Sequence, residues 1–356
     1  MNILIIGLGY AGRRFWRAFE HLSVSTGMPL RLAYVDRKPN ASELPFFPTV
    51  AFALRHFEPD IVVVSVNDES HARILAELSG YRGFVLCEKP LVTPADDLTL
   101  VAEQLSQVSG FALDLVERYS PATQSLRRQI SAQGWSLVRA SFHWGKDRLN
   151  DYRPTCGVTS EVIHALDLVS WICSSADPLQ IHDVLGVRSD FSISGHSVLD
   201  TVSLTGTLGQ ATLAGYASFV NIMRQRTVDF SFIDQEQRVI QARLVFDTPS
   251  WDQDHLRIWT RNDQGREQLI DEQCFSPAQP GLETLHKLSR LCRQVVRWVS
   301  LREMPSQPFA DLQTAIALQH QLNLIESSAR CPAPACYVPY GNRSLLPETS
   351  DLETLG

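Results

Sequence analysis

The sequence lacks long apolar runs, paired cysteine motifs and any excess of basic charge. Its apolar stretches are shorter than the roughly 20 residues that a membrane-spanning helix needs, so we expect no membrane span. The 32 Lys and Arg residues against 39 Asp and Glu give a formal net charge of −7, which disfavours a protein that coats nucleic acid or an anionic membrane. A signal peptide places its basic residues before an apolar segment, whereas Arg13 and Arg14 follow the first apolar run. We therefore expect a cytoplasmic protein.

The cysteines are scattered and odd in number. There are seven, at positions 87, 156, 173, 274, 292, 331 and 336. No C-x-x-C pair occurs, so the sequence predicts neither a disulfide framework nor a metal site. We expect most of these residues to be small buried apolar groups. Only Cys331 and Cys336 are candidates for a disulfide.

The length and the pattern of the first third predict a nucleotide-binding fold in a chain of more than one domain. A chain of 356 residues with 44% hydrophobic content exceeds the roughly 250–300 residues of one ordinary core. Residues 1–118 alternate short apolar runs with helical patterns, which is typical of an α/β domain with a doubly wound parallel sheet. The predicted strands cover residues 2–6, 31–35, 60–65, 83–87 and 111–116, and the predicted helices cover 11–22, 71–78 and 94–107.

The second part of the chain has a different texture. Residues 119–330 contain alternating polar and apolar segments that predict antiparallel strands with one covered face. The predicted strands cover 137–143, 197–208, 210–219, 227–233 and 239–246, and the predicted helices cover 159–173, 283–300 and 311–328. The pattern therefore indicates an α+β domain. A proline-rich tail, residues 331–356, follows it, and we expect this tail to be poorly ordered or draped over the surface.

A glycine motif links the first predicted strand to the first predicted helix. Residues 7–12 read GLGYAG, which has the spacing GxGxxG. Such glycines allow a tight turn, close approach of the backbone to a pyrophosphate, and tight packing of helix against strand. The helix N-terminus then offers unpaired N–H groups to the phosphates. Because a buried strand precedes the motif and a parallel sheet follows, we expect it to bind a dinucleotide.

Asp36 ends the second predicted strand. A carboxylate at this place accepts hydrogen bonds from the ribose hydroxyls and repels a 2′-phosphate, which favours NAD over NADP. Arg37 and Lys38 follow directly, and cations there are an alternative that would hold the phosphate of NADP, unless they form a solvated turn. The distance from Gly7 to Asp36 exceeds the usual roughly 20 residues. We interpret residues 23–29 as a loop extension that accounts for the excess.

Three further stretches give the chain a family resemblance. Residues 65–71 read SVNDESH after a predicted strand, residues 87–91 read CEKPL after the next, and residues 157–167 read GVTSEVIHALD in a predicted helix. With the glycine motif, these stretches resemble the glucose–fructose oxidoreductase / inositol 2-dehydrogenase (Gfo/Idh/MocA) family over roughly residues 1–328. The resemblance implies a Rossmann domain followed by an α+β domain with a large open, mainly antiparallel sheet. It also implies a homodimer or homotetramer formed through the free face of that sheet.

The resemblance assigns roles to individual residues. Lys89 matches the catalytic lysine, and His164 matches the histidine that meets the reacting oxygen of the substrate. The expected cofactor-binding residues are Gly7, Gly9, Tyr10, Ala11, Gly12, Asp36, Arg37, Ser65, Val66, Asn67, His71, Glu88, Lys89 and Pro90. The expected substrate-binding residues are Arg118, Lys146, Tyr152, Arg153, Ser160, Glu161 and His164.

One departure from the family pattern concerns the substrate. The family carries an aspartate four residues before its histidine, and this chain has Ser160 there. Glu161 lies three residues before His164 and could supply a displaced carboxylate from the same face of the helix. Without the aspartate, which grips adjacent hydroxyls, a polyol or sugar substrate is less strongly implied. Asp167 lies one turn beyond His164, where it could fix the tautomer of the ring or form a structural hydrogen bond.

These residues suit hydride transfer to or from a carbonyl carbon. A lysine in a partly dry pocket can serve as general acid and base, and a histidine can share or relay the proton. The leading hypothesis is an NAD(P)-dependent oxidoreductase that acts on the carbonyl or hydroxyl group of a small polar molecule. One alternative is an imine or ketone reductase of specialised metabolism. Another is an inactive dinucleotide-sensing or scaffold protein, although such a protein does not need both Lys89 and His164.

Overall fold

A computed structural model describes residues 1–39, 43–149, 155–173, 177–192, 195–277, 282 and 284–338. The chain divides into two compact units. The first unit comprises residues 1–116 and 285–320, and the second comprises residues 117–284 and 321–356.

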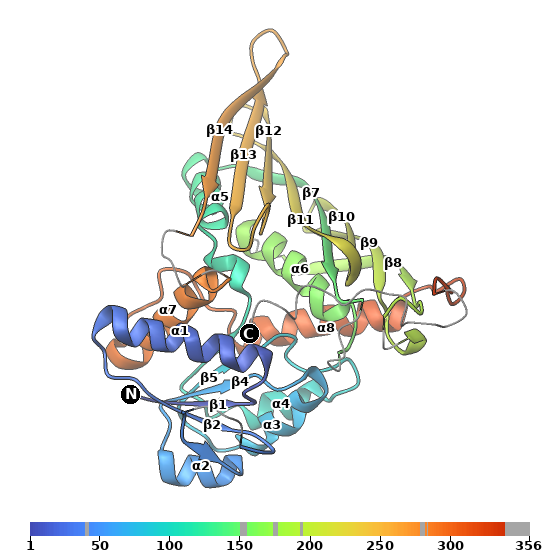
Figure 1. Ribbon diagram of the computed structural model, residues 1–356. Helices are drawn as coiled ribbons and strands as arrows, with labels where there is room; N and C mark the ends of the chain where they lie inside the picture. Colours follow the sequence, from blue (N-terminus) through green and yellow to red (C-terminus); the bar gives the residue numbers. More distant parts are fainter. Residues whose placement is uncertain are drawn as a thin grey trace. The chain divides into compact units, whose positions relative to one another are not determined.

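The first unit is a parallel sheet with helices on both faces (Figure 1). Its six strands lie in the order β3-β2-β1-β4-β5-β6, and every pairing is parallel. The strands are β1 (Asn2–Ile6), β2 (Arg31–Val35), β3 (Phe46–Phe47), β4 (Ile61–Val64), β5 (Phe84–Cys87) and β6 (Gly110–Leu113). The helices are α1 (Tyr10–Thr26), α2 (Val50–Phe57), α3 (His71–Glu77), α4 (Leu98–Gln104), α7 (His286–Leu301) and the first half of α8 (Leu312–Ser328).

The apolar runs of the sequence form the core of this sheet. Strands β4 and β5 are buried along their whole length, as expected for strands that are covered on both faces. Helix α1 buries one stripe, which includes Phe15, Phe19 and Leu22, and α1 and α7 lie side by side on one face of the sheet (Figure 1). The doubly wound parallel sheet predicted from the sequence is confirmed.

Several boundaries differ from the expected ones for local reasons. Helix α1 continues to Thr26 and ends at Gly27, whose φ of 67° is left-handed. The excess spacing before Asp36 is therefore largely an extra helical turn, and the interpretation of residues 23–29 as a loop is wrong for its first half. Helix α4 begins only at Leu98, because Asp97 accepts hydrogen bonds from the backbone N–H groups of Thr99 and Leu100 and so caps it. The sequence analysis did not predict α2.

The second unit is built on an eight-stranded sheet in the order β14-β13-β12-β11-β7-β10-β9-β8. All its pairings are antiparallel except that of β7 with β10, which is parallel. The strands are β7 (Ser136–Asp147), β8 (Leu179–Val187), β9 (Thr201–Leu208), β10 (Ala211–Ser218), β11 (Val220–Ile233), β12 (Val239–Val245), β13 (Asp254–Arg261) and β14 (Glu267–Phe275). The predicted α+β fold with a mainly antiparallel sheet is confirmed.

Helices cover one face of this sheet. Helix α6 (Thr159–Cys173) packs against β7 and β10, and α5 (Pro121–Gln133) packs against β12, β13 and β14. Helix α6 is almost entirely buried, and it spans the residues that the sequence predicts. The sequence analysis did not predict α5, β8, β13 and β14. Short 3₁₀ turns occur at Asp68–Ser70, Val116–Tyr119 and Gly195–Ser197.

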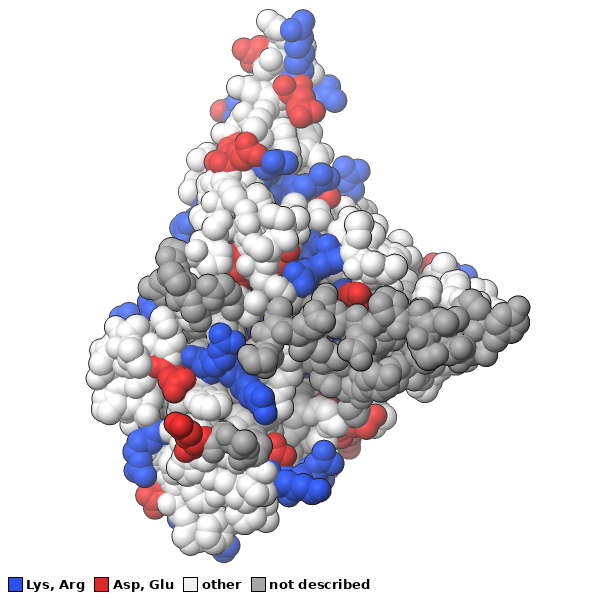
Figure 2. Space-filling view, in the orientation of Figure 1, with Lys and Arg blue, Asp and Glu red and all other residues white. Residues whose placement is uncertain are grey.

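The other face of the large sheet is mainly polar, although it also exposes Leu185 and Val239. Its side chains include Ser203, Thr205 and Thr212, and Arg243 donates to Asp229 across two strands at 2.6 Å. On the face of the molecule in Figure 2, Lys and Arg side chains are interspersed with Asp and Glu side chains. This mixture is what the small net charge predicts.

The later part of the chain crosses between the units. Residues 285–320 group with the first unit, and residues 321–338 group with the second. The division predicted from the sequence, at residues 118 and 330, places residues 285–320 with the second domain. In the structure they group with the first unit, because α7 packs against α1. Within the proline-rich tail, Ala335 forms a parallel bridge with Ser189. The rest of the tail, residues 339–356, lies outside the described residues.

All seven cysteines are free thiols, so the candidate disulfide between Cys331 and Cys336 is absent. Only Cys87 and Cys292 are fully buried, and three of the seven are exposed. The expectation that most are buried is therefore wrong. Burial, assisted by the charges of Glu88 and Asp114, raises the pKa of the Cys87 thiol well above its usual value. Within the described ranges, no helix has the length and apolar character needed to cross a bilayer.

Candidate active site

Three of the predicted cofactor-binding segments meet at one edge of the parallel sheet. Strands β1, β4 and β5 are neighbours, and all run in the same direction. The glycine motif follows β1, Ser65 follows β4, and Glu88 follows β5. The carboxyl ends of adjacent parallel strands are where open α/β sheets bind their ligands. The fold therefore gathers these segments into one site within the first unit.

The glycines of the motif differ in the space around them. A Cβ atom added to Gly12 would lie 2.0 Å from the Gly7 carbonyl oxygen, and one on Gly7, where φ is 89°, would lie 2.8 Å from Val66 Cγ1. Gly9 is exposed, and a Cβ atom there would have no neighbour within 4 Å. Gly7 and Gly12 thus serve the packing of strand, loop and helix. Gly9 leaves open space above the loop, at the N-terminus of α1, where no side chain caps the backbone N–H groups.

Asp36 is tied to the glycine loop. Its Oδ2 accepts a hydrogen bond from the backbone N–H of Leu8 at 3.0 Å, and its Oδ1 accepts one from that of Arg37 at 2.7 Å. Each carboxylate oxygen has a second lone pair, so Asp36 retains acceptor capacity for ribose hydroxyls. Arg37 and Lys38 are exposed. Asp36 therefore lies beside the loop at a position that suits an adenosine ribose.

The loop after β4 and the turn with Lys89 are held together by His71. The ring of this buried residue contacts the Pro90 carbonyl oxygen through Nδ1 at 2.8 Å and the Val66 carbonyl oxygen through Nε2 at 3.1 Å. Ser65 Oγ donates to the Gly7 carbonyl at 2.9 Å. Predicted cofactor-binding residues from all three loops are therefore linked by hydrogen bonds. His71 and Ser65 support the loops through these contacts.

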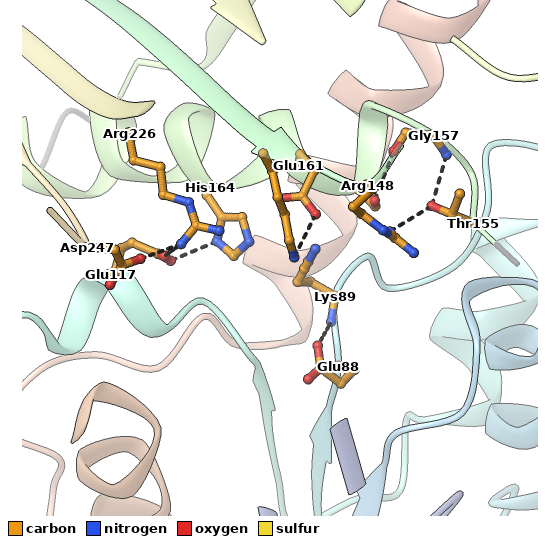
Figure 3. A network of polar contacts seen from close by, with 12 residues as sticks. Glu88, Lys89, Glu117, Arg148, Thr155, Gly157, Glu161, His164, Arg226 and Asp247 are labelled. Carbon is orange, nitrogen blue, oxygen red and sulfur yellow. Dashed lines mark hydrogen bonds and ion pairs between the residues drawn. The ribbon is translucent and has the colours of Figure 1, made fainter. Parts of the chain in front are cut away.

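Lys89 lies in a turn whose backbone is fixed. The Glu88 N–H donates to the Val64 carbonyl at 2.8 Å, and the Lys89 N–H donates to Glu88 Oε2 at 3.2 Å (Figure 3). The Lys89 side chain is half-buried. A fixed backbone limits where the amine can reach, which is what a general acid or base requires.

In the second unit, His164 projects from α6 towards the charged side chains of Glu117 and Arg226 (Figure 3). Its ring stacks on that of Trp144 with centroids 5.6 Å apart and an interplanar angle of 18°. Its Nδ1 lies 2.8 Å from Glu117 Oε2. The stack and the carboxylate together restrict the orientation of the imidazole.

Glu117 belongs to a buried chain of charges. Arg226 Nη1 lies 3.8 Å from Glu117 Oε1 and 2.5 Å from Asp247 Oδ2. Burial opposes the charge of Arg226, but the negative charges of Asp247, Glu117 and Glu161 outweigh it and raise the pKa of the guanidinium. Arg226 is therefore a permanent cation beside the Glu117 carboxylate. The sequence analysis selected none of Glu117, Arg226 and Asp247.

The predicted substrate-binding residues on α6 and β7 have partners in the same unit. Ser160 Oγ donates to the Gly157 carbonyl at 2.9 Å, so this hydroxyl serves the first turn of α6. Lys146 Nζ lies 3.6 Å from Glu161 Oε1. Arg148 donates to Thr155 Oγ1 at 3.3 Å. Two further candidates, Tyr152 and Arg153, lie outside the described residues.

Arg118 and Asp167 form a buried pair. Arg118 donates to Asp167 through Nε at 2.8 Å and through Nη2, and Arg118 also lies over the ring of Trp171. Of the two roles considered for Asp167, the structure shows the structural hydrogen bond. The carboxylate beside the His164 ring is that of Glu117. The guanidinium of Arg118 is engaged by Asp167, so Arg118 links the 3₁₀ turn at Val116–Tyr119 to α6.

We predict that Asp167→Asn destabilises the second unit without changing cofactor affinity. Removing one partner of a buried ion pair leaves the other charge uncompensated, which costs about 3–5 kcal/mol. Thermal unfolding followed by circular dichroism would measure the loss. Asp183→Asn, which breaks the exposed pair with Arg330, is the matched control and should change stability by less than about 1 kcal/mol. Equal effects of the two changes would contradict the structural function of Asp167.

Comparisons with known proteins agree with this geometry. Residues 1–110 match the model of GFO_IDH_MocA, described as an oxidoreductase family with an NAD-binding Rossmann fold. Residues 1–110 therefore match the NAD-binding domain of the Gfo/Idh/MocA family. Inositol 2-dehydrogenase 1 from Saccharopolyspora erythraea is 29% identical over 120 residues, which are 33% of this chain and 36% of that protein. The matched stretches span only about two fifths or less of the length of the curated relatives.

Solved structures resemble the chain over most of its length. An oxidoreductase domain protein from Kribbella flavida has a TM-score of 0.72 at 16% identity and covers 92% of this chain and 96% of its own. The transcriptional regulator Gal80p from Kluyveromyces lactis has a TM-score of 0.70 at 12% identity, and the match covers 92% of this chain and 89% of the Gal80p chain. At these identities the likeness concerns the fold alone. The same fold therefore occurs in proteins described as an oxidoreductase and as a regulator.

Proposed function

We propose that this protein is a member of the Gfo/Idh/MocA family and an NAD(P)-dependent oxidoreductase that acts on the carbonyl or hydroxyl group of a small polar molecule. The observation that carries the proposal is the glycine loop. The space above Gly9 is open, while Gly7 and Gly12 are closely packed, and the N-terminus of α1 faces that space without a side-chain cap. This arrangement suits a pyrophosphate. The residues that would hold the dinucleotide are those of the glycine loop, Asp36 and the loops after β4 and β5.

Each polar residue has a distinct task in this proposal. A bound nicotinamide would supply or accept the hydride. Lys89, in its fixed turn, would donate a proton to the substrate oxygen or remove one from it. His164, whose ring is oriented by Trp144, is the second candidate for proton exchange with the substrate. Asp36 would accept the ribose hydroxyls and favour NAD.

The substrate class follows from the departure at Ser160. The hydroxyl of Ser160 is used within α6, so it is poorly suited to grip adjacent hydroxyls of a polyol. A cyclic or sugar-like substrate is compatible with the inositol 2-dehydrogenase relatives, and a less hydroxylated ketone or imine is compatible with Ser160. Lys146, Glu161 and the segment around residues 152–153 are the proposed substrate contacts.

A second candidate function is dinucleotide sensing without turnover. It is favoured by the resemblance of the fold to Gal80p, which is described as a transcriptional regulator. The joint presence of Lys89 and the oriented His164 favours the enzyme, because a sensor needs no proton relay. Binding and turnover assays separate the two candidates.

We also propose that the free face of the eight-stranded sheet forms a homodimer or homotetramer. The face is mainly polar, so the interface would depend more on hydrogen bonds and ion pairs than on an apolar core. Light scattering at rising salt concentration would test this. A monomeric mass at every salt concentration, including the lowest, would contradict this proposal.

The proposed activity is tested by binding first and turnover second. The protein contains seven tryptophans, so NADH or NADPH should quench its fluorescence on binding. Candidate ketones, sugars and imines are then screened for loss of absorbance by the reduced nicotinamide. Binding with turnover supports the enzyme. Binding without turnover across a broad panel favours the sensor, and absence of binding contradicts both candidates.

We predict that Asp36→Asn shifts the cofactor preference towards NADP. Asparagine keeps an acceptor for the Leu8 N–H but loses the charge that repels a 2′-phosphate. The affinity for NADPH should rise by about tenfold, which corresponds to about 1.4 kcal/mol, and fluorescence titration would measure it. Asp60→Asn is the control, because Asp60 also accepts a backbone N–H, that of Asn2, but at the other edge of the sheet. An unchanged ratio of the two affinities in the Asp36 variant would contradict the assignment.

A further inference from the structure

The carboxylate nearest to His164 among the described residues is not the one that the family pattern supplies. The family position holds Ser160, and its hydroxyl donates to the Gly157 carbonyl. Glu161, the neighbouring acid, lies beside Lys146. Glu117 instead approaches His164 Nδ1 at 2.8 Å from the 3₁₀ turn at Val116–Tyr119. The partner of the imidazole thus comes from a different element of the second unit.

We propose that Glu117 is a positioning residue for His164, which keeps the proton on Nδ1 and presents Nε2 to the substrate. This inference rests on the proposed oxidoreductase function. A neutral imidazole carries one N–H and one lone pair. A carboxylate beside Nδ1 attracts the N–H and repels the lone pair, so the tautomer with the proton on Nδ1 is favoured. Nε2 is then the nitrogen that exchanges a proton with the substrate.

The neighbours of Glu117 suit this task. Arg226 lies 3.8 Å from its Oε1, and Asp247 binds Arg226 in turn. The cation keeps Glu117 in the charged form that can accept the N–H. Arg226 also lies over the ring of Trp144, with its guanidinium carbon 5.4 Å from the centroid, and Trp144 stacks on His164. One arginine, which Figure 3 shows beside Glu117, therefore supports both the carboxylate and the Trp144 ring that orient the imidazole.

The charge of Glu117 also matters when the proton moves. If Nε2 accepts a proton, His164 becomes an imidazolium, and the adjacent carboxylate stabilises that charge. The proton returns from Nε2 to the substrate oxygen or to solvent, and no electrons move at this residue.

The kinetic test uses the isosteric variant Glu117→Gln. We expect kcat to fall by about 100-fold while KM for the cofactor stays within about twofold. Glu272→Gln, which removes the carboxylate of an exposed pair with Arg257, is the matched control and should keep full activity. In a His164→Asn background, Glu117→Gln should cause almost no further loss, because it acts through the imidazole. A loss in that background as large as in the wild type would overturn the proposal.

A second readout does not depend on activity. Nuclear magnetic resonance of protein labelled with ¹⁵N in histidine reports which ring nitrogen carries the proton, and His164→Asn assigns the signals. We expect the neutral His164 ring to be protonated on Nδ1 in the wild type and to lose this preference in Glu117→Gln. Protonation on Nε2 in the wild type would overturn the proposal. If no substrate is turned over at all, the proposed function fails, but this measurement still decides the role of Glu117.

Discussion

Replacing Lys89 with methionine should abolish turnover and leave cofactor binding nearly intact. Methionine keeps the length of the side chain but removes the amine that donates and accepts the proton. General acid–base catalysis contributes about 10²–10⁴-fold, so we expect kcat to fall by about this factor. The backbone contacts of the turn, from Glu88 to Val64 and from His71 to Pro90, do not involve the amine. The dissociation constant for NADH, measured by fluorescence quenching, should therefore change by less than about twofold.

Lys89→Arg separates proton transfer from simple charge. Arginine keeps a positive charge at this place but does not release its proton at neutral pH, so the variant should be as inactive as Lys89→Met. Arg82→Ala, an exposed change just before β5, is the control and should keep full activity. Substantial turnover by Lys89→Arg would mean that Lys89 holds the substrate by charge alone. Substantial turnover by Lys89→Met would remove Lys89 from the mechanism.

Replacing Gly9 with valine should abolish cofactor binding in a protein that folds normally. A Cβ atom at Gly9 has no protein neighbour within 4 Å, and the φ of −79° is one that any residue adopts. The side chain would instead fill the space proposed for the pyrophosphate. We expect the affinity for NADH to fall by at least about 100-fold, or about 2.8 kcal/mol. The melting temperature of the protein without cofactor should stay the same.

The glycine at the other end of α1 provides the matched control. Gly27 also has no neighbour within 4 Å of an added Cβ atom, but its φ of 67° is left-handed. Gly27→Ala should therefore lower stability by about 1–2 kcal/mol and leave the affinity for NADH unchanged. If Gly9→Val binds NADH as tightly as the wild type, the dinucleotide does not lie over this loop, and the proposed cofactor site is wrong.

Local patterns predicted the parts of the site that neighbouring residues determine. The glycine motif, the turn with Lys89 and the helix with His164 each follow or form an element whose apolar pattern is clear in the sequence. The parallel sheet then brings the loops after β1, β4 and β5 to one edge without further information. These parts could be predicted because a strand, a turn and a helix start depend on short stretches of chain.

Long-range contacts determined the parts that the sequence did not reveal. Glu117 reaches His164 across 47 positions, and Arg226 comes from a strand of the large sheet. No spacing rule connects these residues, whereas Asp167 has helical spacing to His164 and was therefore weighed as its partner. Residues 285–320 similarly belong to the first unit because α7 packs against α1, which is far from it in the sequence. Glu117 is a single glutamate with no such spacing to His164, so the sequence alone does not indicate its role.

A crystal structure of the protein with NAD bound tests the central claim most directly. The account predicts that the pyrophosphate lies over Gly9 at the N-terminus of α1, that the ribose hydroxyls bind Asp36, and that the nicotinamide ring lies beside the amine of Lys89. NAD bound elsewhere, or a nicotinamide ring out of reach of Lys89, would contradict the claim that this chain is an oxidoreductase of the proposed kind.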